Sequence, residues 1–248
     1  MPADLALIAV VLLFSATLQT FTGFGFALLS APILAALLGP AEAVSTITVS
    51  GVVVDVLVLA SGGRRPEPHP RDLAQLWAWS VPGLVLGATL LTALPETTLQ
   101  LVVAAAVLLA VWHRARDGGR TVPGPGAGNG RWWPVALAGV SSGALSTATT
   151  LGSPPVVMYL THRPRPVRQT RDTMVALGLL RLPVSVAALW LSGAWVRPAA
   201  LPLLWTAVIV GHLLGRWVFA RLDAARYRRA VLLTLLAAGL TAMISAVT

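Results

Sequence analysis

The first 63 residues carry almost no charge, and this feature restricts the fold more than any other. The only ionisable side chains between residues 1 and 63 are Asp4, Glu42 and Asp55. A membrane-spanning helix needs about 20 mostly apolar residues, so a stretch of this length predicts several consecutive spans. Only 11% of the chain is charged, whereas soluble domains carry about 25% charged residues. We therefore predict an all-α integral membrane protein.

The basic residues are all arginines, and sixteen of the eighteen lie in four short windows. These windows cover residues 64–71, 114–131, 163–171 and 216–229, and apolar stretches separate them. Arginines clustered in this way mark the cytoplasmic loops of multi-span proteins. The net charge of +9 is thus explained by membrane orientation, and we expect no nucleic-acid partner.

Ten apolar segments fit membrane helices, and tryptophans mark several of their ends. They cover residues 4–20, 24–38, 41–60, 74–93, 97–113, 132–149, 152–161, 172–191, 199–219 and 229–247. The segment at 152–161 is too short to span a bilayer and suits a re-entrant helix, so we expect about eight to ten transmembrane segments. The first segment lacks a basic n-region and a cleavage-like site, and it is interpreted as a retained helix.

A stretch rich in Gly, Pro and Arg divides the chain into two halves. We expect one transmembrane repeat at residues 1–113, a cytoplasmic linker at 114–131 and a second repeat at 132–248. Two segments lie between neighbouring arginine windows, so all four windows can lie on the cytoplasmic side. The halves then have opposite orientations, which is the inverted repeat found in many secondary transporters.

Each half opens with a helix that runs into a polar break rich in Gly or Pro. The first break covers Gln19–Gly25 and the second covers Ser146–Pro155. Irregular backbone at membrane depth is tolerated only where protein or a wet cavity satisfies it, and matched breaks indicate a transporter's substrate site. A helix that restarts after a break also offers free N–H groups to an anion. Close helix packing is the alternative, above all for Gly23 and Gly25.

The sequence around the two breaks resembles a known family. Two paired stretches carry the resemblance: GFGFALLSAP (Gly23–Pro32) with GPAEAVSTITVS (Gly39–Ser50), and LGSPPVVMYL (Leu151–Leu160) with VRQTRDTMVAL (Val167–Leu177). They are similar to the first-half and second-half signatures of the TauE/SafE sulfite-exporter-like permeases. The resemblance implies secondary transport of sulfite, sulfonates or related sulfur-containing anions.

The breaks and the apolar segments supply candidate substrate-binding residues. Hydroxyl, amide and backbone N–H groups suit an oxyanion, although Ser and Thr also bond back to their own helix. The candidates are Gln19, Thr22, Gly23, Gly25, Thr149, Thr150, Gly152, Ser153 and Arg181.

Asp55 and Arg181 stand alone within apolar segments, where charges are costly and mark function by default. Arg181 is the expected anion-binding cation, because a guanidinium suits oxyanions. Matching Gly25 to Gly152 gives an offset of 127 residues, which puts Asp55 within one position of Arg181 in the repeat. Asp55 is then a partner of Arg181 or a protonatable coupling site. A structural ion pair between bundles is the alternative.

Three further residues are candidates for coupling or gating. His212 could relay protons, although a lone histidine in an apolar helix also serves packing. Arg168 and Arg171 could attract anions at the cytoplasmic mouth, and topogenic charge is an equally good explanation for both.

These features predict a secondary transporter that moves a small anion, a sulfur oxyanion or organosulfonate, across the inner (cytoplasmic) membrane by alternating access. The expected partners are the anionic substrate, the lipid bilayer, a coupling H+ or Na+ and a second copy of the chain. We expect no cofactor, metal or enzymatic activity, because cysteine, clustered metal ligands and hydrolase or P-loop motifs are missing from the sequence. The alternatives are an anion channel, a carrier of non-sulfur carboxylates, a membrane scaffold and an intramembrane enzyme.

Overall fold

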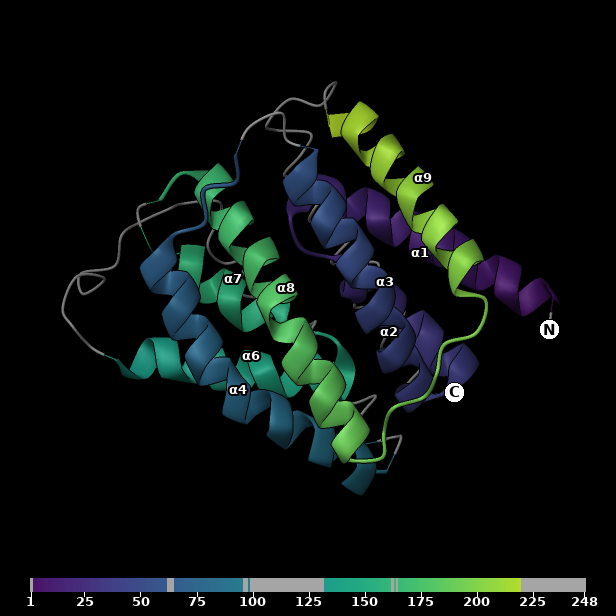
Figure 1. Cartoon of the computed structure of the whole chain (residues 1–248), viewed down its shortest axis with the longest axis horizontal. Coiled ribbons are helices and arrows are strands. Elements are labelled where there is room, and N and C mark those ends of the chain that lie inside the picture. Colours follow the sequence, from purple (N-terminus) through teal and green to yellow (C-terminus); the bar gives the residue numbers. More distant parts are fainter. Residues whose placement is uncertain are drawn as a thin grey trace.

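A computed structural model of the chain describes residues 2–61, 65–95, 98, 132–161, 163 and 165–219 (Figure 1). This part of the chain is helical, and no strand occurs within it. The predicted all-α fold is therefore confirmed. The predicted segments at 97–113 and 229–247 lie outside the described residues, apart from residue 98, and so does the predicted linker at 114–131.

Eight helices make up the described part, and each lies on a predicted segment. They are α1 (Pro2–Thr22), α2 (Phe26–Leu38), α3 (Pro40–Ala60), α4 (Pro70–Ala93), α6 (Trp133–Thr149), α7 (Ser153–Thr161), α8 (Val167–Leu191) and α9 (Leu201–Phe219). Two helices begin four or five residues earlier than predicted. α4 begins at Pro70, which suits the first helical position, and the His69 ring caps it by accepting a hydrogen bond from the Asp72 N–H at 3.2 Å. α8 begins at Val167, directly after Pro166. Its first turns consist mostly of polar residues, which a search for apolar segments does not include.

Four of the described helices are long and apolar enough to cross a membrane. The spans are Pro40–Ala60, Pro70–Ala93, Arg168–Leu191 and Leu201–Val218. α1 and α2 contain shorter apolar stretches, Asp4–Thr20 and Phe26–Leu38. The lengths and composition of these helices therefore suit a multi-pass membrane protein. The total of eight to ten transmembrane segments stays a prediction.

The helices form two bundles (Figure 1). One bundle contains α1, α2, α3 and α9, and the other contains α4, α6, α7 and α8. Each bundle therefore takes three helices from one half of the chain and one helix from the other half. The bundles meet mainly where α3 lies against α8.

Glycines bring the helices of each bundle unusually close together. A Cβ atom at Gly87 of α4 would lie 2.1 Å from the carbonyl oxygen of Ala144 in α6. A Cβ atom at Gly211 of α9 would lie 2.2 Å from the carbonyl oxygen of Leu13 in α1. Only glycine permits such approaches, which are typical of membrane helix packing. These contacts fix α4 to α6 and α9 to α1.

Candidate functional site

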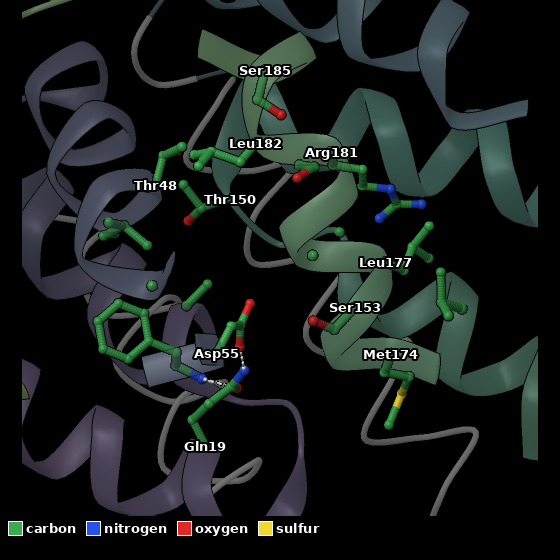
Figure 2. A pocket seen from close by; sticks show the side chains of 18 of the residues that line it. Gln19, Thr48, Asp55, Thr150, Ser153, Met174, Leu177, Arg181, Leu182 and Ser185 are labelled. Atoms are coloured by element: carbon green, nitrogen blue, oxygen red, sulfur yellow. Dashed lines mark hydrogen bonds between the residues drawn. The ribbon is translucent and has the colours of Figure 1, made fainter. Parts of the chain in front are cut away.

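The first predicted break separates α1 from α2 and is held by Gln19. Gly23 and Gly25 have φ angles of 78° and 123°, which glycine adopts without steric cost. Gln19 closes the break, because its Oε1 accepts a hydrogen bond from the Phe26 N–H at 3.1 Å. Its Nε2 donates to Oδ1 of Asp55 at 2.7 Å (Figure 2). One amide therefore connects the start of α2 to a carboxylate on α3.

The second predicted break separates α6 from α7 and is held by Ser142. Thr150 has a left-handed backbone with φ 62°, and α7 begins three residues later. The Ser142 hydroxyl donates to the Gly152 carbonyl, and Nη1 of Arg181 donates to Oγ of Ser142 at 2.9 Å. Ser142 therefore connects the buried guanidinium of Arg181 to the second break, as Gln19 connects the carboxylate of Asp55 to the first.

A cavity of about 140 Å³ lies between the two bundles, with residues of both breaks in its wall (Figure 2). Polar groups come from Gln19, Asp55, Thr150, Ser153, Arg181 and Ser185. The apolar part of the wall includes Phe26, Met174, Leu177 and Leu182. The cavity therefore combines opposite charges with hydroxyl groups and apolar surface.

Most of the predicted substrate-binding residues meet at this cavity. Seven of them line it: Gln19, Gly23, Gly25, Thr150, Gly152, Ser153 and Arg181. Thr149 does not, because its hydroxyl donates back to the Leu145 carbonyl of its own helix at 2.8 Å. The side chain of Thr22 lies outside the described part of the structure.

Arg181 is a buried cation with incomplete hydrogen bonding. Its exposed fraction is 6%, and its Nε and Nη2 have no hydrogen-bond partner among the described residues. A buried charge without a partner is costly. Asp55 lines the same cavity, but no ion pair joins the two side chains in the described part. In Figure 2 the guanidinium and the carboxylate point in different directions.

The gating candidates Arg168, Arg171 and His212 are not among the residues that line the cavity. Nη2 of Arg171 donates to the Thr20 carbonyl at 2.7 Å, so this side chain crosses from one bundle to the other. It also lies over Gly23, where a Cβ atom would be 2.4 Å from Arg171 Cγ. His212 is buried on α9, with Nδ1 3.0 Å from Oγ1 of Thr20. Arg168 is exposed on α8.

A buried charge cluster at the start of α4 has no counterpart in the sequence predictions. Asp72 is fully buried, with Oδ2 2.8 Å from Nε of Arg165 and Oδ1 3.3 Å from Nη1 of Arg163. Nδ1 of His69 lies 3.1 Å from Oδ2. The cluster ties α4 to the connection between α7 and α8. Within the described residues, no group of three or more His, Cys, Asp or Glu side chains is arranged to hold a metal ion.

Comparison with known proteins bears on the whole chain rather than on single residues. The family model described as Sulfite exporter TauE/SafE matches residues 7–242. No curated protein and no solved structure matches the chain. Because the family model covers nearly the full length and includes both breaks, the chain belongs to the sulfite exporter TauE/SafE family of membrane transporters.

Proposed function

We propose that the chain is a secondary transporter for a small sulfur oxyanion or organosulfonate that binds between the two bundles. Arg181 carries the proposal, because it is buried, lines the cavity and has two donor groups without a protein acceptor. A guanidinium offers a planar set of N–H donors that matches the oxygens of an oxyanion. An anion in the cavity would supply both the missing acceptor and the missing counter-charge.

The size of the cavity supports a small cargo. Its volume of about 140 Å³ is below the roughly 300–1,000 Å³ of sites for drug-sized ligands. The hydroxyl groups of Thr150, Ser153 and Ser185 also lie in its wall. They give an oxyanion further hydrogen-bond donors beside the guanidinium.

The helix boundaries support two repeats of the same backbone. At the offset of 127 residues, the end of α1 corresponds to the end of α6, and the starts of α2 and α3 correspond to the starts of α7 and α8. Gly23 and Thr150 are equivalent at this offset, and both have positive φ angles.

The packing supports an inverted arrangement of these repeats. α1 packs along α9 as its equivalent α6 packs along α4, so the two halves exchange their fourth helices. A two-fold axis that passes through the contact between α3 and α8 would produce this exchange. In such transporters the bundles rock about a central site and open it to each side in turn. We assign the chain this alternating access. The coupling ion and the homodimer stay predictions.

Uptake into liposomes tests this function. We would reconstitute the full chain and measure uptake of labelled sulfite, thiosulfate and short sulfonates, with sulfate, acetate and chloride as comparisons. Losing charge-assisted hydrogen bonds worth about 1.5–3 kcal/mol should raise the KM of Arg181→Gln by about tenfold or more. Arg197→Gln, an exposed arginine beyond the end of α8, is the matched control and should transport normally. Uptake of acetate alone would point to a carboxylate carrier, and uptake of no anion would refute the proposal.

Counter-transport separates a carrier from an anion channel. Unlabelled substrate inside the liposomes should accelerate entry of labelled substrate, because a loaded carrier returns to the outward-facing state faster than an empty one. A channel has no such return step, so identical entry rates with and without internal substrate would exclude alternating access.

A further inference from the structure

The face of α8 that lines the cavity continues toward the start of the helix as far as Arg171. The lining residues of this face recur every three or four positions, as neighbours on one side of a helix do: Met174, Gly178, Leu182 and Ser185. Arg171 lies on the same face, one turn before Met174, and it is not among the residues that line the cavity. Arg171 therefore lies where this face leaves the cavity.

Arg171 joins this end of α8 to the last turn of α1. Its Nη2 donates to the Thr20 carbonyl at 2.7 Å, and the carbonyls in the last turn of a helix have no partner within that helix. A cation at this negative end of the helix dipole is also favourable. The Arg171 stem lies on Gly23, where a Cβ atom would be 2.4 Å from Cγ. Because Gly23 belongs to the cavity wall, one side chain of α8 covers the wall at this end and bonds to the other bundle.

Apolar side chains occupy the equivalent position at the opposite end of the cavity. α3 and α8 run in opposite directions, because a Cβ atom at Gly178 would lie 2.6 Å from Oδ2 of Asp55, whereas Val44 near the start of α3 shares a cluster with residues near the end of α8. Val44 is the equivalent of Arg171 at the offset of 127 residues, and it continues the lining face of α3 one turn before Thr48. The members of its cluster that belong to the other bundle include Ala88, Leu91, Ala148, Ala188 and Leu189. The two ends of the cavity therefore differ in the chemistry of their contacts between the bundles.

We propose that Arg171 is the gate residue at one end of the cavity: its hydrogen bond to Thr20 holds α8 against α1, and breaking this bond opens that end. This assignment rests on the alternating access of the proposed function, and it adds the residue that controls one of the two openings. Rocking of the bundles must break the bond, because it joins one bundle to the other. Water that enters the open end hydrates both the guanidinium and the carbonyl, so the net cost of opening is modest. Arg171 belongs to an arginine window, and such windows face the cytoplasm, so we expect this gate on the cytoplasmic side.

A single cysteine in the cavity wall reports whether this end is open. The chain contains no cysteine, so Met174→Cys would supply its only thiol. Met174 lines the cavity one turn beyond Arg171, and in Figure 2 it lies toward the end of the cavity where Gln19 is. A membrane-impermeant maleimide would be added to inverted membrane vesicles, which expose the cytoplasmic side, and to right-side-out vesicles. The labelling rate then measures how often the reagent reaches the cavity from each side.

Removing the guanidinium should open this end more often. Arg171→Ala should raise the labelling rate of Met174→Cys in inverted vesicles by about tenfold, the effect of losing a hydrogen bond from a charged donor, and should not raise the rate in right-side-out vesicles. Arg71→Ala removes an exposed arginine at the start of α4 and is the matched control, which should label at the wild-type rate.

A second variant displaces Arg171 without removing it. Gly23→Ala puts a methyl group against the Arg171 stem and should also raise the labelling rate in inverted vesicles. Gly193→Ala introduces the same methyl group where nothing lies within 4 Å and should leave the rate unchanged. This pair tests the gate even if Arg171→Ala folds poorly.

The outcomes separate the gate from the proposed function. Faster labelling from one side alone, with Arg71→Ala unchanged, supports the gate. Faster labelling from both sides would overturn it, because the substitution would then loosen the whole cavity, and an unchanged rate in Arg171→Ala would overturn it too. Uptake that depends on Arg181 would leave the proposed function intact in either of those cases. If the chain takes up no anion and Arg171→Ala still accelerates labelling from one side, the proposed function fails and Arg171 still closes the cavity.

Discussion

Replacing Gly23 by alanine tests the contact between the two bundles. The φ angle of 78° at Gly23 is unfavourable for alanine, and the new Cβ atom would lie 2.4 Å from Cγ of Arg171. Arg171 must therefore move, and its 2.7 Å hydrogen bond to the Thr20 carbonyl is lost. Gly193 provides the matched control, because its φ angle of 75° is similar and a Cβ atom there meets nothing within 4 Å.

The two substitutions differ by the energy of the Arg171 contact. The left-handed backbone costs alanine about 1–2 kcal/mol at either position. A hydrogen bond from a charged donor contributes about 1.5–3 kcal/mol, and only Gly23→Ala removes one. We therefore expect Gly193→Ala to lower the free energy of unfolding by about 1–2 kcal/mol and Gly23→Ala to lower it by about 2.5–5 kcal/mol.

Unfolding titrations with SDS in mixed micelles, followed by circular dichroism, measure these free energies. A double-mutant cycle completes the test, because Arg171→Ala removes the atom that the new methyl group strikes. In that background Gly23→Ala should cost only about 1–2 kcal/mol, as at Gly193. The reasoning is refuted if Gly23→Ala costs no more than Gly193→Ala in the wild-type background, or if Arg171→Ala leaves its cost unchanged.

Four other substitutions probe contacts within the two bundles. Gly87→Ala places a methyl group 2.1 Å from a backbone oxygen of α6 and should destabilise the protein by about 1–3 kcal/mol. Gly51→Ala meets only an aromatic ring at 3.5 Å and should be neutral or up to about 1 kcal/mol stabilising, as thermal melts in detergent would show. Asp72→Asn removes the partner of Arg165 and should cost about 1–3 kcal/mol. Arg165→Gln should remove part of the same energy, so the two losses should fail to add in the unfolding titration.

The sequence located the helices well where apolar segments meet Gly or Pro. α2 ends before Gly39 and α3 begins at Pro40, within one residue of the predictions. The start of α8 was missed by five residues, because its first turns are polar and hydropathy does not detect them. The helix begins there because Pro166 ends the preceding backbone and the first turns from Val167 contain no Pro or Gly.

The breaks also predicted most of the candidate site, since broken backbone at membrane depth needs polar partners. The partners themselves were harder to predict. Ser142 resembles its neighbour Ser141 in sequence, yet Ser142 bonds to Arg181 and Ser141 bonds back to Leu137. Asp72 lies within an arginine window, yet its two arginine partners come from the other half of the chain. Which hydroxyl or carboxylate meets a distant residue depends on helix rotation, and one sequence does not determine that rotation.

The two halves match in their helix boundaries but not in their buried charges. At the offset of 127, Asp55 corresponds to Leu182 and Arg181 corresponds to Val54, so each buried charge has an apolar equivalent. If both halves carried the same groups, the cavity would present the same chemistry at two ends and would suit a symmetric ligand. A single acid from α3 and a single base from α8 give it two different ends instead. Under the proposed alternating access, rocking of the bundles would depend on the backbone that the halves share, and binding of the anion would depend on Arg181, where the halves differ.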